Sequence, residues 1–345
     1  MIEKNSLPSI SVVMPTLNSA TTLKYCLESI LVQDYPQSLI EVLIVDGGSN
    51  DATLAIAKSF GCRIIQEEKE RNNPEGRKAI GLKSAHNELV AFIDSDNILP
   101  HKEWFKKMVA PLLDSPEIIA TQPLRYAYKS DASILNRYFA LMGVNDPVAY
   151  YLNKRDRMSW AEDTWNLLGD SSERDGYLVV KFKSKNIPTL GANGFLIRRE
   201  ILLKSRCSPQ EFFHIDVNCD LVALGYNTYG LVKEDIIHLT GNTFFSFLGK
   251  RMRYMRRYYQ ENNSARRYSV YTYEDKAKLV RFIFITLTLV KPFYDSFRGY
   301  RKIHDRAWFL HPLMCLGILF AYGWVTIEWW FVSNFRRFKK SLMRK

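Results

Sequence analysis

The chain has 345 residues, of which 47% are hydrophobic, and it carries a formal net charge of +12 at pH 7. This length allows one large or two modest domains with real cores, and the basic excess predicts an anionic partner: nucleic acid, a sugar nucleotide or the anionic face of a membrane. The five cysteines are scattered and form no CxxC pair, which excludes a disulfide framework and a structural zinc site and favours a reducing compartment. Residues 1–11 contain no apolar run, so we expect no signal peptide.

The first hundred residues alternate between predicted strands and predicted helices. Short apolar runs predict strands at 10–15, 41–46, 63–66 and 89–94, and the segments between them predict helices at about 23–31, 52–60 and 77–85. Strand–helix alternation of this kind implies parallel pairing, because each helix returns the chain to the same end of the sheet. We therefore predict an α/β fold with a Rossmann-like, mostly parallel sheet flanked by helices.

The strand predicted at 89–94 ends in two carboxylates, Asp94 and Asp96, one residue apart. In an open α/β sheet, ligands bind outside the carboxyl ends of the strands, so both side chains are expected where chemistry occurs. Two carboxylates this close repel each other unless protons or a cation lie between them, and a hard divalent cation that also binds phosphate oxygens satisfies both. The alternative is a strand that ends in an ordinary polar turn.

Patterns become weaker after the first hundred residues, and residues 125–188 in particular predict an insert of helices and loops. Regular structure resumes at 189–199, and a later helix ends at Gly225. We predict one domain over residues 1–240 that contains this insert.

Two common nucleotide-binding motifs are absent from the sequence. No G-x-G-x-x-G follows the first predicted strand, which argues against a nicotinamide or flavin dinucleotide, and no G-x-x-x-x-G-K-[ST] marks a P-loop ATPase. Asp46, at the end of the second predicted strand, can instead accept a hydrogen bond from a base N–H or a ribose hydroxyl. Its alternative role is that of a turn or N-cap aspartate.

The C-terminal region, residues 241–345, is basic, aromatic and hydrophobic. Residues 307–327 contain no formal charge, are accompanied by tryptophans and are interrupted by a proline and two glycines, a pattern typical of an interfacial or re-entrant helix. A true membrane span and an ordinary core helix remain alternatives. In residues 250–268 arginines interleave with tyrosines and methionines, and a lipid-facing amphipathic segment is favoured here over a nucleic-acid patch. We therefore predict a membrane surface, and no nucleic acid, as a partner of this region.

Three segments together resemble the family 2 inverting glycosyltransferases with the GT-A fold. They are Ser11–Asn18, Val45–Asp51 and Phe92–Asp96, and their order and spacing are similar to that family's over about residues 8–240. The resemblance implies a nucleotide-sugar donor, a UDP- or GDP-sugar, and a divalent cation, Mn or Mg, on its diphosphate.

The resemblance also implies a role for each matching residue. Pro15, Thr16 and Asn18 line the base and ribose, Asp46 contacts the base, Arg77 lies near the ribose or diphosphate, Asp94 with Ser95 contacts the ribose or metal, Asp96 ligates the metal, and His238 lies near the metal or diphosphate. Lys78 stands where the family often has an asparagine. A structural role is the alternative for His238.

The base of this family belongs to an acidic motif that begins a helix. Here Ile215-Asp216 replaces the usual Glu-Asp pair, so Asp216 is the predicted base that takes the acceptor's proton, with Asp220 and Glu211 as alternatives. A carboxylate stabilised by the helix dipole is the structural alternative for Asp216. The turn Gly191–Gly194 is expected to contact the acceptor or the donor sugar.

These features predict a metal-assisted, inverting glycosyltransferase at the cytoplasmic face of a membrane, acting on a lipid-linked acceptor. Two other functions remain open, as does the oligomeric state. A nucleotidyltransferase would carry a glycine-rich basic loop after the first strand, where this chain has Pro15–Asn18. A catalytically silent, membrane-anchored nucleotide-sugar-binding protein would keep the fold but would need neither the metal nor Asp216.

Overall fold

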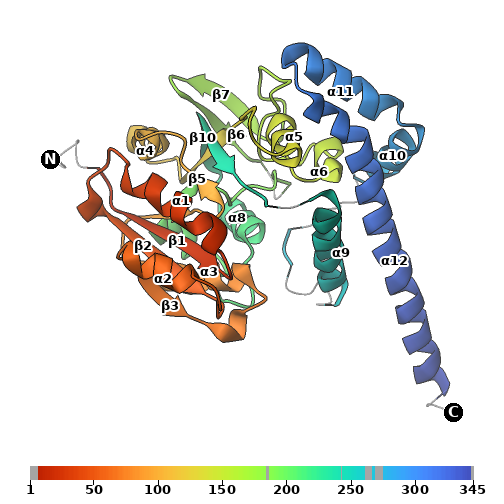
Figure 1. Cartoon of the computed structure of the whole chain (residues 1–345), viewed down its shortest axis with the longest axis horizontal. Coiled ribbons are helices and arrows are strands. Elements are labelled where there is room, and N and C mark those ends of the chain that lie inside the picture. The colour runs from red at the N-terminus through yellow and green to blue at the C-terminus, as the bar shows by residue number, and fades with distance from the viewer. Residues whose placement is uncertain (1–6, 184–185, 242, 261–265, 269–274, 343–345) are drawn as a thin grey trace.

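The computed structural model describes residues 7–342 except 184–185, 242, 261–265 and 269–274. Figure 1 shows an α/β body beside a group of C-terminal helices, from which the long helix α12 projects. Parts of two predicted segments, residues 1–11 and 250–268, lie outside the described residues.

One mixed sheet of ten strands forms the centre of the body. Its strand order is β3-β2-β1-β4-β9-β6-β10-β8-β7, and β5 pairs with the end of β10. The strands are β1 (Ile10–Thr16), β2 (Ile40–Asp46), β3 (Arg63–Gln66), β4 (Leu89–Phe92), β5 (Asn97–Ile98), β6 (Ala120–Tyr126), β7 (Asp170–Arg174), β8 (Tyr177–Lys181), β9 (Phe195–Arg198) and β10 (Thr228–His238). The predicted parallel layer is confirmed for β1 to β4, whereas β9 runs antiparallel between β4 and β6. The carboxyl ends of β1, β2 and β4 therefore meet at one end of the sheet.

Helices cover both faces of the sheet, because alternate strand residues point to opposite sides. In β1, Val12 and Met14 lie in the core under α1, α2 and α4, whereas Val13 lies in the opposite core under α3 and α8. These helices are α1 (Ala20–Leu31), α2 (Thr53–Ser59), α3 (Pro74–Ser84), α4 (Trp104–Asp114), α7 (Arg199–Leu202) and α8 (His214–Ala223), with short 3₁₀ turns at Gln37–Leu39 and Glu68–Glu70.

A third apolar cluster joins the predicted insert to the C-terminal helices. Tyr138 of α5 lies in it with Phe282 of α10, Trp308 and Ile318, and all four side chains are at most 1% exposed. The helices here are α5 (Ile134–Met142), α6 (Pro147–Tyr151), α9 (Phe244–Gln260), α10 (Asp275–Thr288), α11 (Val290–Lys302) and α12 (His311–Leu342), with a 3₁₀ turn at Arg306–Leu310. The insert thus packs against the C-terminal region, and a domain division near residue 240 stays a prediction.

The insert also contains a β-hairpin that the sequence analysis did not predict. β7 has the sequence DSSER, and every residue in it is exposed. A wholly polar segment carries no alternating pattern, so only its antiparallel pairing with β8 makes it a strand. β8 in turn pairs with β10 and extends the main sheet.

α12 is one continuous helix, although its proline and glycines suggested interruptions. Pro312 causes no break because it lies in the first turn, where its missing N–H has no intrahelical acceptor to lose. Gly317 lets α9 approach closely, since a Cβ there would come within 3.0 Å of Phe244 and 2.9 Å of Leu248. The two helices therefore pack tightly.

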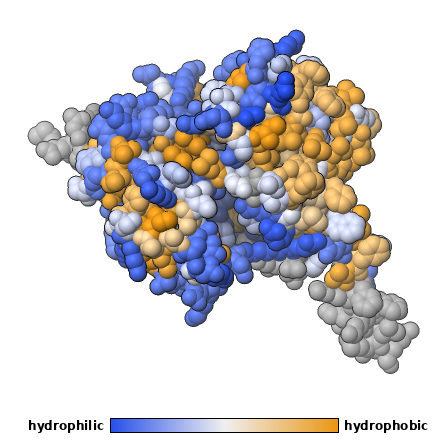
Figure 2. All heavy atoms as spheres, in the orientation of Figure 1, coloured by the Kyte–Doolittle hydropathy of each residue, from blue (hydrophilic) through white to orange (hydrophobic). Residues whose placement is uncertain are grey.

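The opposite face of α12 is open. Phe320 and Trp324 are 65% and 52% exposed, while Ile318 and Val325 are buried. Figure 2 shows apolar side chains gathered over α10 to α12. By length and composition alone, the segment Arg306–Asn334 is long and apolar enough to cross a membrane.

Candidate active site

Two loops at the carboxyl ends of β1 and β2 are held together around Asp46. Its buried carboxylate accepts hydrogen bonds from the hydroxyls of Thr16 at 2.9 Å and Ser49 at 2.5 Å, and from the backbone N–H groups of Gly48 at 2.8 Å and Ser49 at 2.7 Å. Asn18, with a φ of 51°, reaches across to accept from a backbone N–H of the second loop at 2.9 Å. A carboxylate has about four acceptor positions, so these four hydrogen bonds occupy the acceptor capacity of Asp46. Its contact with a nucleotide base stays a prediction.

Arg77 lies beneath the second loop. Its guanidinium donates to the carbonyls of Glu70 and Arg71 at 2.6 and 2.7 Å, and a Cβ on Gly47 would come within 2.6 Å of it. Burial lowers the pKa of Arg77, against the opposing effect of nearby carboxylates. Arg77 therefore supports the second loop from below, and its contact with ribose or diphosphate stays a prediction. Pro15 is buried in β1, and its contact with the base and ribose also stays a prediction.

A chain of ionic side chains leads away from Asp94. Lys78 of α3 is 3% exposed, and its Nζ lies 3.2 Å from Asp94 Oδ1 and 3.4 Å from Glu75 Oε1. Glu75 Oε2 accepts from the backbone N–H of His214 at 2.8 Å and lies 3.0 Å from His214 Nδ1. Burial opposes charge on Glu75 and Lys78, but the opposite charges around them outweigh it, so the pKa of Glu75 is well below its usual value and that of Lys78 is above. The sequence analysis missed Glu75 and His214, which lie 139 residues apart.

Asp96 faces His238 at the end of β10. His238 Nε2 lies 3.5 Å from Asp96 Oδ2. Burial raises the pKa of Asp96, but His238 and a lysine of α9 outweigh this effect and lower it. Asn97 connects this pair to the predicted acceptor-side turn, because its Nδ2 donates to Asn193 Oδ1 at 3.2 Å. The structure therefore brings Asp96, His238 and the turn Gly191–Gly194 together.

Arg157 supports that turn from within the insert. Its Nη2 donates to the carbonyls of Ala192 and Asn193 at 3.1 and 2.9 Å, and its guanidinium lies over the ring of Tyr126 at 5.2 Å. Tyr126 also stacks on His238, with ring centroids 5.6 Å apart. No sequence pattern marked Arg157, because the carbonyls and the aromatic ring that it contacts come from distant segments.

The donors around Asp96 fit a hard divalent cation whose coordination a substrate completes. Asp94, Ser95 and Asp96 form the half-buried turn after β4, and Asp96 and His238 offer an oxygen and a nitrogen 3.5 Å apart. Among the described residues, no group of three or more His, Cys, Asp or Glu is arranged to hold an ion by itself. Ions such as Mg and Mn are commonly held by one or two carboxylates together with substrate phosphates, so this small donor set suffices.

Asp216, the predicted base, holds a different segment. Its carboxylate is 0% exposed and accepts from Arg266 Nε at 2.8 Å, from Arg266 Nη2 at 3.2 Å and from the backbone N–H groups of Arg267 and Tyr268 at 3.2 and 3.1 Å. These contacts occupy both oxygens, which leaves Asp216 no free acceptor in this conformation. Its catalytic role stays a prediction.

The two alternative bases have hydrogen-bond partners as well. Asp220 accepts from Arg267 Nε at 2.9 Å, and Glu211 accepts from the Ser208 hydroxyl at 2.7 Å. Both carboxylates thus stabilise the surroundings of α8.

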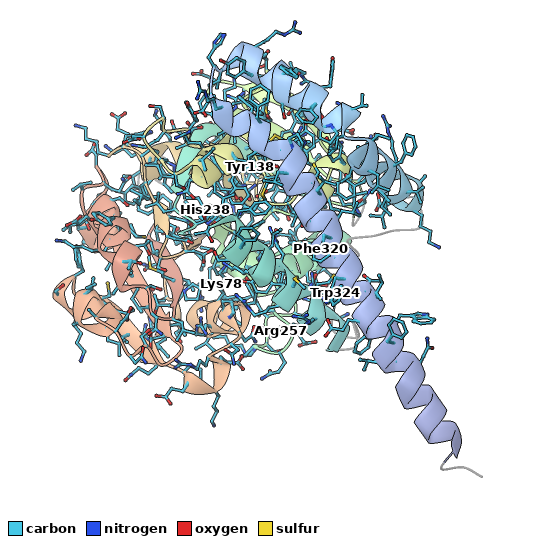
Figure 3. All side chains as sticks on the ribbon, turned by 45° about the vertical axis from the view of Figure 1, so that its right-hand side comes forward. Lys78, Tyr138, His238, Arg257, Phe320 and Trp324 are labelled. Atoms are coloured by element: carbon cyan, nitrogen blue, oxygen red, sulfur yellow. The ribbon has the colours of Figure 1, made fainter. Side chains whose placement is uncertain are left out.

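A polar pocket of about 150 Å³ opens between the strand ends and α9. Figure 3 shows His238 at the strand ends next to α9. The pocket is lined by Asp96, Asn145, His238, Thr240, Phe247, Lys250, Arg251 and Tyr254. It places two cationic side chains of α9, Lys250 and Arg251, opposite Asp96.

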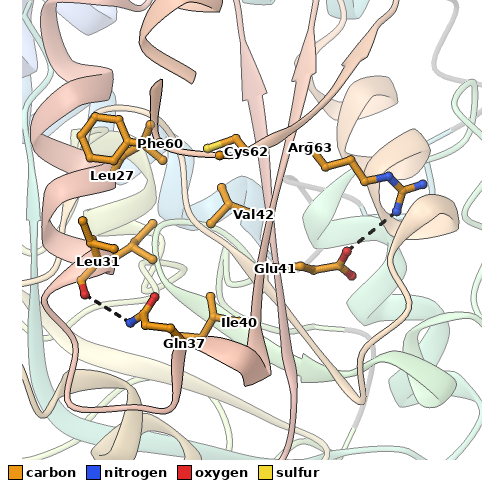
Figure 4. Close-up of a pocket in the computed structure, with 11 residues that line it drawn as sticks. Leu27, Leu31, Gln37, Ile40, Glu41, Val42, Phe60, Cys62 and Arg63 are labelled. Atoms are coloured by element: carbon orange, nitrogen blue, oxygen red, sulfur yellow. Dashed lines mark hydrogen bonds and ion pairs between the residues drawn. The ribbon is translucent and has the colours of Figure 1, made fainter. Parts of the chain in front are cut away.

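A second hollow, of about 250 Å³, lies at the other end of the strands. It is lined by the start of β2 and by α1 and β3, and it includes the Glu41–Arg63 ion pair at 3.8 Å (Figure 4). Glu41 is the second residue of β2 whereas Asp46 is its last, so this hollow lies away from the predicted site residues.

Comparison with known proteins identifies the family. Residues 11–204, more than half of the chain, match the family model Glycosyl transferase family 2. Glycosyltransferase AglE of Haloferax volcanii is 29% identical over 139 residues, which are 39% of this chain and 45% of that protein. Poly(ribitol-phosphate) beta-N-acetylglucosaminyltransferase TarS of Staphylococcus aureus is 35% identical over 104 residues, 29% of this chain and 18% of that protein. The chain thus matches less than half the length of either relative.

A solved structure shares the fold. Mannosyltransferase PcManGT from Pyrobaculum calidifontis, in complex with GDP-Man and Mn2+, superimposes with a TM-score of 0.51 at 15% identity, covering 92% of this chain and 87% of that one. At this identity the likeness concerns the fold alone. The predicted GT-A fold is therefore confirmed, and the chain belongs to glycosyl transferase family 2.

Proposed function

We propose that the protein transfers a sugar, with inversion, from a nucleotide-sugar donor to a lipid-linked acceptor at a membrane surface. One observation carries this proposal: in a family 2 chain, the partly exposed carboxylates Asp94 and Asp96 stand at the carboxyl end of a buried strand, beside His238. AglE and TarS are named as glycosyltransferases, and PcManGT was solved with GDP-Man and Mn2+. The PcManGT complex supports a GDP-sugar as donor and Mn as the cation, and a UDP-sugar and Mg are further members of the same proposal.

The donor would occupy the carboxyl ends of β1, β2 and β4. Thr16 donates to Asp46 there, and Asn18 accepts from the backbone N–H of Asn50 in the same second loop, so the surface offered to a nucleoside is rigid before binding. Arg77, buried just below, adds positive charge on the side proposed for the diphosphate. A bound cation, held by Asp96 and His238, would supply neutralisation of the charge that gathers on the departing nucleoside diphosphate.

The acceptor would enter from α9. Lys250 and Arg251 line the pocket that reaches Asp96, so they are positioned to attract the phosphate of a lipid carrier. α9 packs against α12 and is linked to it by an ion pair between Arg256 and Glu328 at 2.9 Å. The proposed phosphate position and the apolar face of α12 therefore adjoin the same helix.

The C-terminal helices, within the proposed region 241–345, would lie on the membrane. On α10, Val280, Phe284 and Leu287 are 66%, 68% and 66% exposed, and their spacing places them on one face of the helix. Together with Phe320 and Trp324 of α12, they form an apolar surface with an aromatic component, which favours the interface between headgroups and acyl chains. All five cysteines are free thiols, as is typical of a reducing compartment, and this supports the cytoplasmic face.

A thermal-shift panel tests the transferase proposal. The full chain is heated with UDP, GDP, ADP and their sugar conjugates, with and without Mn. We expect one nucleotide to raise the melting temperature only when Mn is present, because a ligand that binds only the folded state stabilises it. Binding without any release of nucleoside diphosphate would favour the silent binding protein, and release of inorganic pyrophosphate would favour the nucleotidyltransferase.

A further inference from the structure

We infer that His214, oriented by Glu75, is the base that takes the proton from an acceptor hydroxyl. This inference rests on the proposed transferase function and specifies its nucleophile. A phosphate oxygen of a lipid carrier is already ionised near neutral pH and needs no base, whereas a hydroxyl must lose its proton as it attacks. A dedicated base therefore indicates a sugar or other hydroxyl on the acceptor.

The imidazole of His214 is held in one orientation. Glu75 Oε2 lies 3.0 Å from Nδ1 and accepts from the backbone N–H of the same residue at 2.8 Å. The ring of Phe213 stacks on the imidazole with centroids 4.7 Å apart. A carboxylate at Nδ1 favours the tautomer with its proton there, which leaves Nε2 as a lone-pair acceptor. Among the described residues Nε2 has no hydrogen-bond partner, and the side chain is 18% exposed.

The charged groups around His214 suit a base that becomes cationic. His214 begins α8, where the helix dipole disfavours positive charge, and the ionised Glu75 offsets this effect. Lys78 keeps Glu75 ionised and is itself neutralised by Asp94. Asp156 of the insert also has a coulombic interaction with His214, and burial raises the pKa of the Asp156 carboxyl. An imidazolium at His214 therefore has the Glu75 carboxylate in direct contact.

The position of His214 connects the two sides of the site. Lys78 bridges Glu75 to Asp94, so the histidine is tied to the turn that carries the predicted donor ligands. A Cβ on Gly191 would come within 2.7 Å of the His214 carbonyl, so the predicted acceptor-side turn packs directly on this residue. Asp216 is two residues further along the helix, about 200° around its axis, and faces residues 266–268 instead.

The step balances with these groups alone. The acceptor O–H bond breaks and its proton moves to Nε2 of His214. The acceptor oxygen bonds to C1 of the donor sugar, and the bond from C1 to the phosphate oxygen breaks, its electron pair leaving with the nucleoside diphosphate. The imidazolium afterwards releases its proton to water.

The discriminating variant is His214→Asn. The asparagine amide can still donate to Glu75 from the position of Nδ1, but it has nothing at the position of Nε2. The full chain is assayed with Mn for release of nucleoside diphosphate from UDP-glucose and GDP-mannose, using octyl glucoside, undecaprenyl phosphate or water alone as acceptor. His86→Asn is the matched control, since His86 is exposed beside the start of β4. Nucleotide-induced thermal shifts report folding and donor binding of each variant.

We expect His214→Asn to slow release with octyl glucoside and with water by about 10²–10⁴-fold, with an unchanged thermal shift, and His86→Asn to behave as the wild type. Added imidazole should partly restore His214→Ala, which a purely structural histidine would not show. Glu75→Gln, which changes a positioning residue, should slow release by about tenfold or more.

Three results with variants would overturn the inference, and one result with the wild type would do the same. They are full activity of His214→Asn, no response of His214→Ala to imidazole, and loss of transfer in Asp216→Asn with intact donor binding while His214→Asn stays active. Transfer by the wild type to undecaprenyl phosphate alone would also overturn it, because that nucleophile needs no base. A wild type that binds no nucleotide and releases no diphosphate would instead refute the proposed function itself.

Discussion

The two sides of the site are built in different ways. On the donor side, functional residues stand at the ends of adjacent parallel strands, and the contacts that shape the nucleoside surface join neighbouring loops, as between Thr16 and Asp46. Asp96 is the exception, because its partner His238 lies on β10. On the acceptor side, contacts join segments far apart in the chain: His214 with Glu75, 139 residues away, and Arg257 with Asn72, 185 residues away. Because these donor-side contacts are local, we expect a substitution there to remove nucleotide binding without loss of the fold. A substitution among the C-terminal helices should change membrane attachment or stability instead.

The largest effect is expected on the donor side, at Asp96. Asp96→Ala removes the carboxylate that faces His238, so Mn should no longer increase nucleotide binding and transfer should fall by about 10²–10³-fold or more. Thermal shift with and without Mn measures the first effect, and release of nucleoside diphosphate measures the second. Asp34→Ala is the control, because Asp34 pairs with Lys106 on the surface. An unaltered Mn-dependent shift in Asp96→Ala would place the metal elsewhere.

The next effect is expected at the C-terminal helices. Phe320→Glu combined with Trp324→Glu places two charges on the open face of α12, and partition onto vesicles of phosphatidylcholine and phosphatidylglycerol should fall by at least about tenfold. Sedimentation with vesicles measures it. The control pair is Leu31→Glu with Leu224→Glu, both 57% exposed on the α/β body. Equal sedimentation of the two double variants would refute the membrane assignment of α12, while donor binding should be unchanged in both.

A third prediction concerns stability within the C-terminal region. A Cβ on Gly299 would overlap the buried Trp308 ring, so Gly299→Ala should lower the free energy of unfolding by about 1–3 kcal/mol. Gly323 in α12 has open space around it, and Gly323→Ala should raise that free energy by up to about 1 kcal/mol through helix propensity. Urea denaturation compares the two. Similar midpoints would mean that α11 does not pack on Trp308 as described.

The smallest effect is a pH dependence at Asp235 of β10. Burial raises the pKa of Asp235 to about 6, with Glu234 adding to the effect and Arg125 and His101 opposing it. The folded state therefore binds this proton more tightly than the unfolded state, in which an aspartate has a pKa near about 4. The protonated Asp235 stabilises the fold fully below about pH 4, and this stabilisation is lost as the pH rises through about 6. Asp235→Asn should flatten the stability profile between pH 4 and 7 by about 1–2 kcal/mol. Urea midpoints across this range measure it, and a parallel profile for wild type and variant would contradict the prediction.

Much of the fold and of the donor side could be predicted from the sequence, because both depend on local patterns. An apolar run predicts β4, and the turn chemistry after it predicts that Asp94 and Asp96 emerge at a strand end. Where no local pattern exists, prediction failed. The polar strand β7 acquires its conformation only from β8, and Arg157 acquires its role only from the carbonyls it meets.

By itself, the sequence determined the family, the parallel layer and the strand-end carboxylates, since a strand, its length and its final residue follow from neighbours in the chain. Tertiary structure alone decided what the side chains at the start of α8 contact. His214 and Asp216 lie only two residues apart in the first turn of that helix. Their environments differ because one meets Glu75 of α3 and the other meets Arg266, and such pairings depend on where distant segments pack. Tertiary packing likewise decided the two faces of α12. One face is buried against α9, and among the described residues nothing packs on the other.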